Sequence, residues 1–346
     1  MILRWMERRP LGVAGLAVAL LTAPPLHAEQ KSVDAARVVK AVTGGLRALE
    51  KGTLNYAEQR SCFTCHHQTL PLLAQATARK HGFKINEEVF ENQTRFTHES
   101  FKERHDSLRR GTGIGGKSMT VGFALWALDL AKWKSDETTE AMAAYLLKTQ
   151  EKDGRFFTNS TRPPLEDSPA TSATIAAYFL QRFATDAQKA AAEESVEKAR
   201  HWLFDYKPDR QEDRNSQLWG MHLLDASDED IAAARKAVLA SQQDDGGWSQ
   251  LPDMASDSYA TGQALWMLQE SGLATSDPAY QRGVRLLLDS QQEDGSWLVK
   301  TRSKPIQRHF ESGFPHGKDQ FISICGTSWA VAALAATQPP LREEPP

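Results

Sequence analysis

The five residues from Cys62 to His66, CFTCH, carry the most specific chemistry in this sequence. Two thiols three residues apart can add to the two vinyl groups of haem, and the histidine that follows can ligate the iron. We therefore predict one covalently bound haem c, attached through Cys62 and Cys65, with His66 as the axial metal ligand. The alternatives are a Cys62–Cys65 disulfide, a zinc site completed by His66 or His67, and a pair of inert buried thiols.

A sixth ligand to that iron would have to come from elsewhere in the chain. His67 is adjacent to His66 and cannot easily reach the same iron. The candidates are Met119, His98, His105 and His316. Each of these residue types is also common in ordinary core or surface positions.

A second segment with a chemical signature is residues 111–118, GTGIGGKS, which match the phosphate-loop pattern. A phosphate loop requires a buried strand before it and a helix after it. The preceding residues 105–110 do not have the composition of such a strand. We interpret the glycines as a flexible connection into a helix.

The beginning of the chain predicts export. Three arginines occur among the first nine residues, an apolar run follows at 11–21, and Ala28 offers a cleavage position. This order is typical of a signal peptide over residues 1–28. The run is shorter than the roughly 20 residues that span a bilayer, although an uncleaved anchor is the alternative. We expect a periplasmic or secreted protein with no transmembrane segment after signal removal.

The charge balance excludes one class of partner. The formal net charge is -3, with 41 basic and 44 acidic residues. Such a chain has no strong positive field to attract nucleic acid. We therefore expect no nucleic-acid partner.

Three segments of the chain look like copies of one another. Residues 150–156, 242–248 and 291–297 each follow the pattern Gln-x-x-x-Gly-x-aromatic. The last two aromatic residues are 49 positions apart and the first two are 92 apart, about two periods. A degenerate copy is therefore expected at 199–206. Self-similarity at a fixed period is the signature of a repeat architecture.

Between these copies lie short alanine-rich segments that are apolar nearly all round. A helix without a polar face must be buried on all sides, whereas its partners, with one polar face, lie outside. The expected inner helices include residues 123–128, 173–178, 263–268 and 329–334, and the expected outer helices include 186–203 and 228–241. Two concentric rings of such hairpins form an α/α toroid, and five or six hairpins fit the chain.

The residues leading into the inner helices should gather at one end of the rings. Aligning the inner helices on one another makes 117–119, 166–168 and 256–258 equivalent. The same register places Cys65 to Gln68 just before an inner helix over 69–78. We therefore expect the cysteine–histidine segment at this end.

The Gln-x-x-x-Gly-x-Trp pattern after an outer helix resembles the QW motif of squalene-hopene cyclases and related prenyltransferase-fold proteins. The resemblance extends to exported bacterial members that carry a CxxCH segment. It implies an all-α, single (α/α)5–6 toroid over residues 29–337, followed by a disordered tail at 338–346. It also implies a cavity for an apolar or isoprenoid small molecule.

The sequence departs from that family where the chemistry is concerned. No D-x-D-D acid motif occurs, and no Asp-x-Cys matches the zinc ligands of prenyltransferases, although Cys325 lies in the last inner helix. The acids and the histidine to consider instead are Asp257, Asp167, Asp319 and His316. The last two belong to a long connection near the end of the chain, and such loops often bind ligands.

Two functions follow from these observations. The first is an exported toroid with one haem c that transfers electrons to a redox partner or performs redox chemistry on a bound ligand. The second is a haem-free toroid that binds or processes an isoprenoid, in which the two cysteines form a disulfide or a metal site.

Overall fold

The computed structural model describes residues 33–305 and 308–341 of the chain. The predicted signal peptide and residues 342–346 lie outside this part. Within it, regular structure is helical, and β-pairing is limited to two isolated bridges, Gln150–Phe156 and Arg162–Glu166. The prediction of an all-α fold is confirmed.

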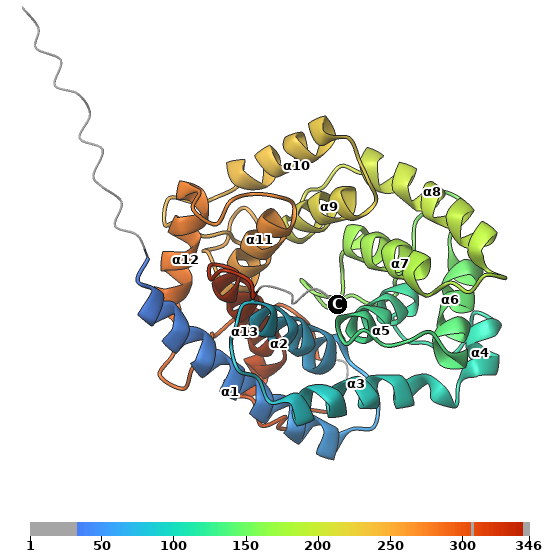
Figure 1. Cartoon of the computed structure of the whole chain (residues 1–346), viewed down its shortest axis with the longest axis horizontal. Helices are drawn as coiled ribbons and strands as arrows, with labels where there is room; N and C mark the ends of the chain where they lie inside the picture. Colours follow the sequence, from blue (N-terminus) through green and yellow to red (C-terminus); the bar gives the residue numbers. More distant parts are fainter. Residues whose placement is uncertain (1–32, 306–307, 342–346) are drawn as a thin grey trace, which may run out of the picture. The chain divides into compact units, whose positions relative to one another are not determined.

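The helices form two concentric layers (Figure 1). Six helices of the described part form the inner layer: α2 (Leu70–Lys80), α5 (Lys117–Leu130), α7 (Pro169–Phe183), α9 (Gln211–Leu223), α11 (Ser258–Glu270) and α13 (Gln320–Ala335). Each packs against the next, and α13 packs against α2, so the inner ring is closed. The described part thus contains six hairpins, the larger of the two numbers predicted.

The outer layer is formed by the partner helices and a short additional one. They are α1 (Ala35–Gln59), α3 (Glu87–Lys102), α4 (His105–Arg109), α6 (Glu137–Thr149), α8 (Lys189–Asp205), α10 (Asp228–Ala240) and α12 (Pro278–Ser290). Inner and outer helices alternate along the chain, so consecutive inner helices run in the same direction. Two short turns, η1 (Cys65–Thr69) and η2 (Gly317–Asp319), lead into α2 and α13.

Small residues let the inner helices approach one another closely. Gly262 of α11 lies against the backbone of α13, where an added Cβ would come within 2.6 Å of the Trp329 carbonyl carbon. In α10, by contrast, Val238 is the one buried residue. The sequence-based separation of inner from outer helices is confirmed.

The repeated glutamines connect neighbouring hairpins. In each copy the side-chain amide donates to the carbonyl of the turn glycine and to a carbonyl of the next outer helix. Gln150 reaches Ser195 of α8 at 2.7 Å, Gln242 reaches Ala279 of α12 at 2.8 Å, and Gln291 reaches Ala41 of α1 at 2.9 Å. One amide thus joins its own turn to the neighbouring outer helix and stabilises two elements at once.

The tryptophans of the repeat close the same turns. The indole N–H of Trp248 donates to the Val238 carbonyl at 2.8 Å, and that of Trp297 donates to the Leu287 carbonyl at 2.7 Å. At the degenerate copy the amide of Gln217, on α9, donates to the carbonyls of Leu203 and Tyr206 instead.

A cluster of four tryptophans occupies the middle of the inner ring. Trp126, Trp219, Trp266 and Trp329 come from α5, α9, α11 and α13, with ring centroids 4.8–6.2 Å apart in the contacting pairs. All four are buried. We call this group the tryptophan cluster.

The chain after α13 contacts the C-terminal end of α2. The Leu341 N–H donates to the Lys80 carbonyl at 2.8 Å, and the Gln338 carbonyl contacts the His81 ring nitrogen. These residues begin the segment that the sequence predicts to be a disordered tail.

A glycine at the last repeat turn tests how tightly the ring is closed. Gly295 has φ of +85°, and an added Cβ would lie 2.5 Å from the Gly44 carbonyl oxygen on α1. Gly113 is a matched control, because its φ is +80° but its nearest neighbour would lie at 3.5 Å. We expect Gly295→Ala to lower the free energy of unfolding by about 1–3 kcal/mol more than Gly113→Ala, the usual cost of overpacking. Equal losses in urea unfolding would show that α1 moves away freely.

Candidate functional site

The starts of the inner helices converge at one end of the ring. Hydrogen bonds link the η1 turn to the residues before α7, and the first turns of α7, α9 and α11 to one another. The predicted gathering of these segments at one end is therefore confirmed. We call this end of the ring the rim. Three of its features have reactive groups: the cysteine–histidine turn, a carboxylate that contacts Cys65, and a buried acid on α9.

The cysteine–histidine turn begins after Thr64, which caps η1. The Thr64 hydroxyl accepts from the His67 N–H at 3.4 Å, and the backbone N–H of Thr64 donates to the Gln68 side chain at 2.9 Å. The turn places the two thiols differently, since Cys62 is exposed and Cys65 is buried. Neither is bonded to another cysteine.

The two histidines lie among aromatic rings. The His67 ring stacks on Tyr56 with centroids 4.7 Å apart, and Phe321 of α13 contacts both imidazoles edge-on. The His66 Nδ1 atom contacts the Thr64 hydroxyl and His67 Nδ1, while its Nε2 atom has no hydrogen-bond partner among the described residues. His67 is fully buried, and its Nε2 atom also lacks a partner there.

Burial keeps both imidazoles neutral. It lowers the pKa of His66 to about 3, with a further contribution from the nearby Arg162 guanidinium. Burial and the neighbouring His66 lower the pKa of His67 as well. A neutral imidazole is the form that binds a metal, and a second hydrogen bond to its other nitrogen fixes its orientation. His66 has this arrangement.

The thiol of Cys65 faces a carboxylate. Cys65 Sγ donates to Glu166 Oε1 at 2.8 Å, and Glu166 Oε2 accepts from the Ser160 hydroxyl at 2.9 Å and from the Arg162 guanidinium. Burial, followed by the negative charge of Glu166, raises the pKa of Cys65. The thiol is therefore protonated at neutral pH.

Glu212, the second residue of α9, is a buried acid that has no basic partner among the described residues. Its carboxyl group receives hydrogen bonds from Thr171 at 2.9 Å, from Tyr259 at 2.9 Å and from Gln263 at 2.8 Å. Burial raises its pKa to about 8 although these three donors act in the opposite direction. The group is therefore mainly a neutral carboxylic acid at pH 7.

Glu212 faces the middle of the ring rather than its outer wall. Burial, followed by the nearby Glu166 and Glu212, raises the pKa of Cys325 on α13, an inner helix. Trp219 follows Glu212 by seven residues, and Trp266 follows Tyr259 by the same number. At 1.5 Å per residue, the tryptophan cluster lies about 10 Å below this acid. Sequence reasoning missed Glu212, because a glutamate in a first helical turn is ordinarily a solvated residue that stabilises the helix.

The acids proposed from the sequence have local partners instead. Asp257 caps α11 by accepting from the Ala260 N–H at 3.0 Å, and burial raises its pKa to about 6. Asp167 pairs with Arg210 at 2.6 Å. Asp319 pairs with Lys300 at 3.2 Å, and His316 contacts the Ser296 hydroxyl at 2.7 Å. They lie near the rim, but none is bonded to Cys65 or Glu212.

The candidates for a sixth ligand are also dispersed. His98 contacts Asp136 at 2.8 Å and stacks on Trp133, and His105 contacts the Thr138 hydroxyl at 3.0 Å. Both belong to the outer layer. Met119 is buried in the first turn of α5, an inner helix that packs against η1. In place of the strand that a phosphate loop needs, residues 111–118 follow the short helix α4.

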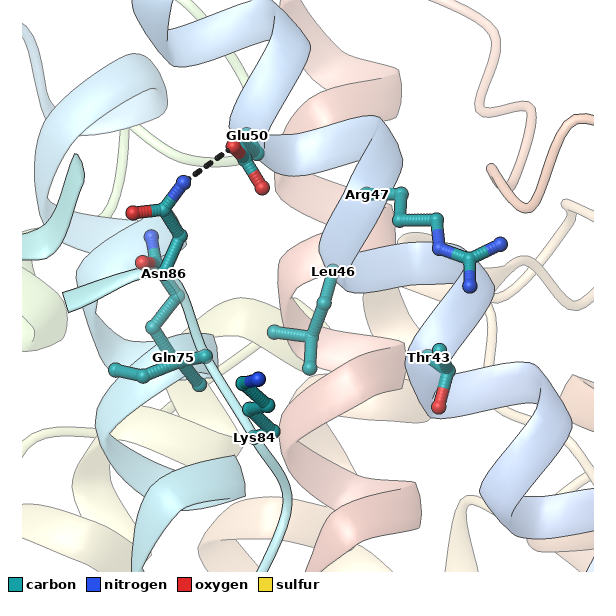
Figure 2. Close-up of a pocket in the computed structure, with 8 residues that line it drawn as sticks. Thr43, Leu46, Arg47, Glu50, Gln75, Lys84 and Asn86 are labelled. Carbon is teal, nitrogen blue, oxygen red and sulfur yellow. Dashed lines mark hydrogen bonds between the residues drawn. The ribbon is translucent and has the colours of Figure 1, made fainter. Parts of the chain in front are cut away.

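Other features of the described residues do not add to this site. A pocket of about 190 Å³ lies between α1, α2 and the chain before α3, lined by residues such as Arg47, Gln75 and Lys84 (Figure 2). There Asn86 donates to Glu50 at 2.6 Å, and no thiol or imidazole lines the pocket. No group of three or more His, Cys, Asp or Glu side chains in the described part could hold a metal ion. None of the described helices is long and apolar enough to cross a membrane.

Comparison with solved structures confirms the fold. The chain is similar to the type II terpene cyclase MstE from Scytonema, with 13% identity and a TM-score of 0.54 over 87% of this chain and 98% of the cyclase. A glycosidase variant in complex with glucose matches with 12% identity and a TM-score of 0.58 over 89% and 100%. A protein from Actinoplanes matches with 14% identity and a TM-score of 0.55 over 88% and 100%. No family model matches the chain. At these identities the likeness shows an α/α toroid, and different chemistries occur on that fold.

The raised pKa of Glu212 predicts that the free energy of unfolding depends on pH. Its pKa of about 8 lies above its ordinary value of 4.5, so the folded state holds this proton more tightly than the unfolded chain does. Its contribution is therefore complete below about pH 4.5 and is lost as the pH rises towards 8. Asp257 acts in the same direction, but its window ends near pH 6. We expect Glu212→Gln to reduce the loss of stability between pH 6 and 8, measured by urea unfolding.

Asp257→Asn is the matched control for this measurement. It should change the pH dependence below about pH 6 and preserve the slope above it. A slope between pH 6 and 8 that Glu212→Gln leaves unaltered would mean that Glu212 is ionised throughout this range.

Proposed function

We propose that this chain is an exported toroid that carries one covalently bound haem c and takes part in electron transfer or in redox chemistry on a bound ligand. The observation that carries the proposal is the state of His66. Its ring is neutral and its Nδ1 atom is held, while Nε2 has no partner among the described residues. This imidazole stands directly after the second thiol of the only CxxCH segment.

The donor set of the turn fits this group. Cys62 is exposed and available for one thioether bond, and His66 presents an uncommitted nitrogen for the iron. Tyr56 and Phe321 supply aromatic surface beside the imidazoles, which suits a large apolar macrocycle. Cys65 fits as the second attachment point once its contact with Glu166 is released.

Each residue has a separate task in this proposal. Cys62 and Cys65 would attach the macrocycle, and His66 would ligate the iron. Tyr56 and Phe321 would exclude water from the imidazole side, because burial there already disfavours charge. When bound, the haem would supply one-electron transfer.

The second candidate is a haem-free toroid that binds or processes an isoprenoid. The observation that favours it is Glu212, a neutral acid about 10 Å above four tryptophan rings, since a buried carboxylic acid is a proton donor and aromatic faces stabilise cations. A variant of MstE was solved in complex with geranylgeranyl dihydroxybenzoate as its substrate. In this alternative Glu212 would act as the acid instead of Asp257, Asp167 or Asp319.

Absorption and mass measurements on the protein exported from a host with cytochrome c maturation machinery distinguish the two candidates. We expect a Soret band that survives denaturation and an intact mass increased by one haem. The double variant Cys62→Ser/Cys65→Ser should lose both signals, and Cys325→Ser should keep them as the matched control. A colourless protein at the bare chain mass would refute the haem proposal and direct attention to Glu212.

Export has a separate test. If the signal peptide is cleaved after Ala28, the mature protein begins at Glu29. We expect N-terminal sequencing of the protein from the periplasm or the medium to start at that residue. Retention of Met1 in a membrane fraction would instead support the uncleaved anchor.

A further inference from the structure

We propose that residues 150–168, which connect α6 to α7, form a cover over Cys65 that is latched by Glu166, so that Cys62 is the first thiol to react and Cys65 reacts only when this cover opens. The inference deepens the proposed haem attachment, and it rests on that function only for the identity of the natural reagent. If it holds, a bond to Cys65 has to form before the connection folds over it or while the latch is released. We call residues 150–168 the cover.

The latch is the carboxylate of Glu166, whose two oxygens accept hydrogen bonds from different segments. Glu166 Oε1 accepts from the thiol of Cys65 at 2.8 Å. Glu166 Oε2 accepts from Ser160 at 2.9 Å and from the guanidinium of Arg162, both within the cover. Arg162 also donates to the Ser160 hydroxyl at 3.2 Å. Contacts of this kind can be replaced by water when the latch opens.

Further polar contacts hold the cover at its edges. The Thr158 hydroxyl donates to the Gly116 carbonyl at 3.2 Å, and Gly116 N–H donates to Asn159 at 2.9 Å, which ties the cover to the start of α5. On the other side, the Ser303 hydroxyl donates to the Pro163 carbonyl at 3.0 Å. The cover is thus attached at its edges by these hydrogen bonds and further by Phe156 and Leu165, which are buried in the core. Cys65 beneath it is 5% exposed.

The chain contains two internal standards for thiol reactivity. Cys62 is exposed and lies outside the cover, and Cys325 is completely buried on α13. The thiol of Cys65, by contrast, lies beneath the cover and donates to Glu166 Oε1 at 2.8 Å. Restricted access therefore opposes reaction at Cys65 while the latch is closed.

The reaction concerned is addition of a thiol to a carbon–carbon double bond. The S–H bond breaks, sulfur bonds to one carbon, and the proton ends on the other carbon, so neither an oxidant nor a reductant is consumed. N-ethylmaleimide reacts in this way and serves as the probe, whether or not haem is the natural reagent.

The experiment is a time course of N-ethylmaleimide labelling on the folded, full-length mature protein without haem, read by peptide mass spectrometry. We expect Cys62 to react first and Cys65 at least about tenfold more slowly, because Cys62 is exposed whereas the reagent reaches Cys65 only when the cover opens locally. Arg162→Ala should accelerate Cys65 severalfold and leave Cys62 unchanged. Arg155→Ala is the matched control, because Arg155 belongs to the cover but pairs with Asp153 at its surface.

Two results would overturn the proposal. One is labelling of Cys65 at the rate of Cys62 in the unaltered protein, and the other is an equal effect of Arg162→Ala and Arg155→Ala on Cys65. Glu166→Gln provides a second variant, which keeps an acceptor for the thiol but weakens the contact with Arg162. Cys325 labelling reports global unfolding, so faster reaction at Cys65 counts only where Cys325 stays protected. Failure of the haem proposal would leave this labelling pattern intact.

Discussion

The common direction of the inner helices is the constraint on which the rest of the structure depends. Because outer and inner helices alternate (Figure 1), every inner helix of the described part begins at the same end of the ring. The N-terminal ends of helices carry unpaired N–H groups and partial positive charge, which favour carboxylates and hydroxyls there. Asp257 and Ser168 cap α11 and α7 at this rim, and Glu212 lies in the first turn of α9. Polar chemistry is thereby concentrated at one end, while the tryptophan cluster occupies the middle of the ring.

Much of this architecture could be predicted because the repeated residues have local tasks. Each repeat, such as residues 291–297, is a short segment with three such residues. It contains a glutamine that bridges two hairpins, a glycine with positive φ and a tryptophan whose indole bonds the preceding helix. The alanine-rich segments indicated burial on all sides for the same local reason. The position of Cys65 at the rim followed from the repeat spacing. The degenerate copy at 199–206 was harder to interpret, since its glutamine is supplied by α9 rather than by the turn.

The chemistry of the rim could not be predicted in the same way, because its partners are distant in sequence. Cys65 and Glu166 are separated by 101 positions, and Glu212 is separated from Tyr259 by 47. In the sequence, Glu212 is one of several charged residues at the start of a helix. Only the closed ring shows that it is buried and has three donors but no cation among the described residues. The aspartates singled out from the sequence have local partners of their own.

Ring closure also makes the chain unusually dependent on its last hairpin. The amide of Gln291 reaches the carbonyl of Ala41 across 250 positions, and α13 packs against α2. Joining segments so far apart costs on the order of 5 kcal/mol in chain entropy, a cost that short-range helical contacts do not recover. The first inner helix, α2, thus lacks its neighbour α13 until synthesis is almost complete. Until then the apolar surface of α2 that α13 covers is exposed to water. If the chain is exported as proposed, that surface must be kept from aggregating until the C-terminal end has left the translocation pore.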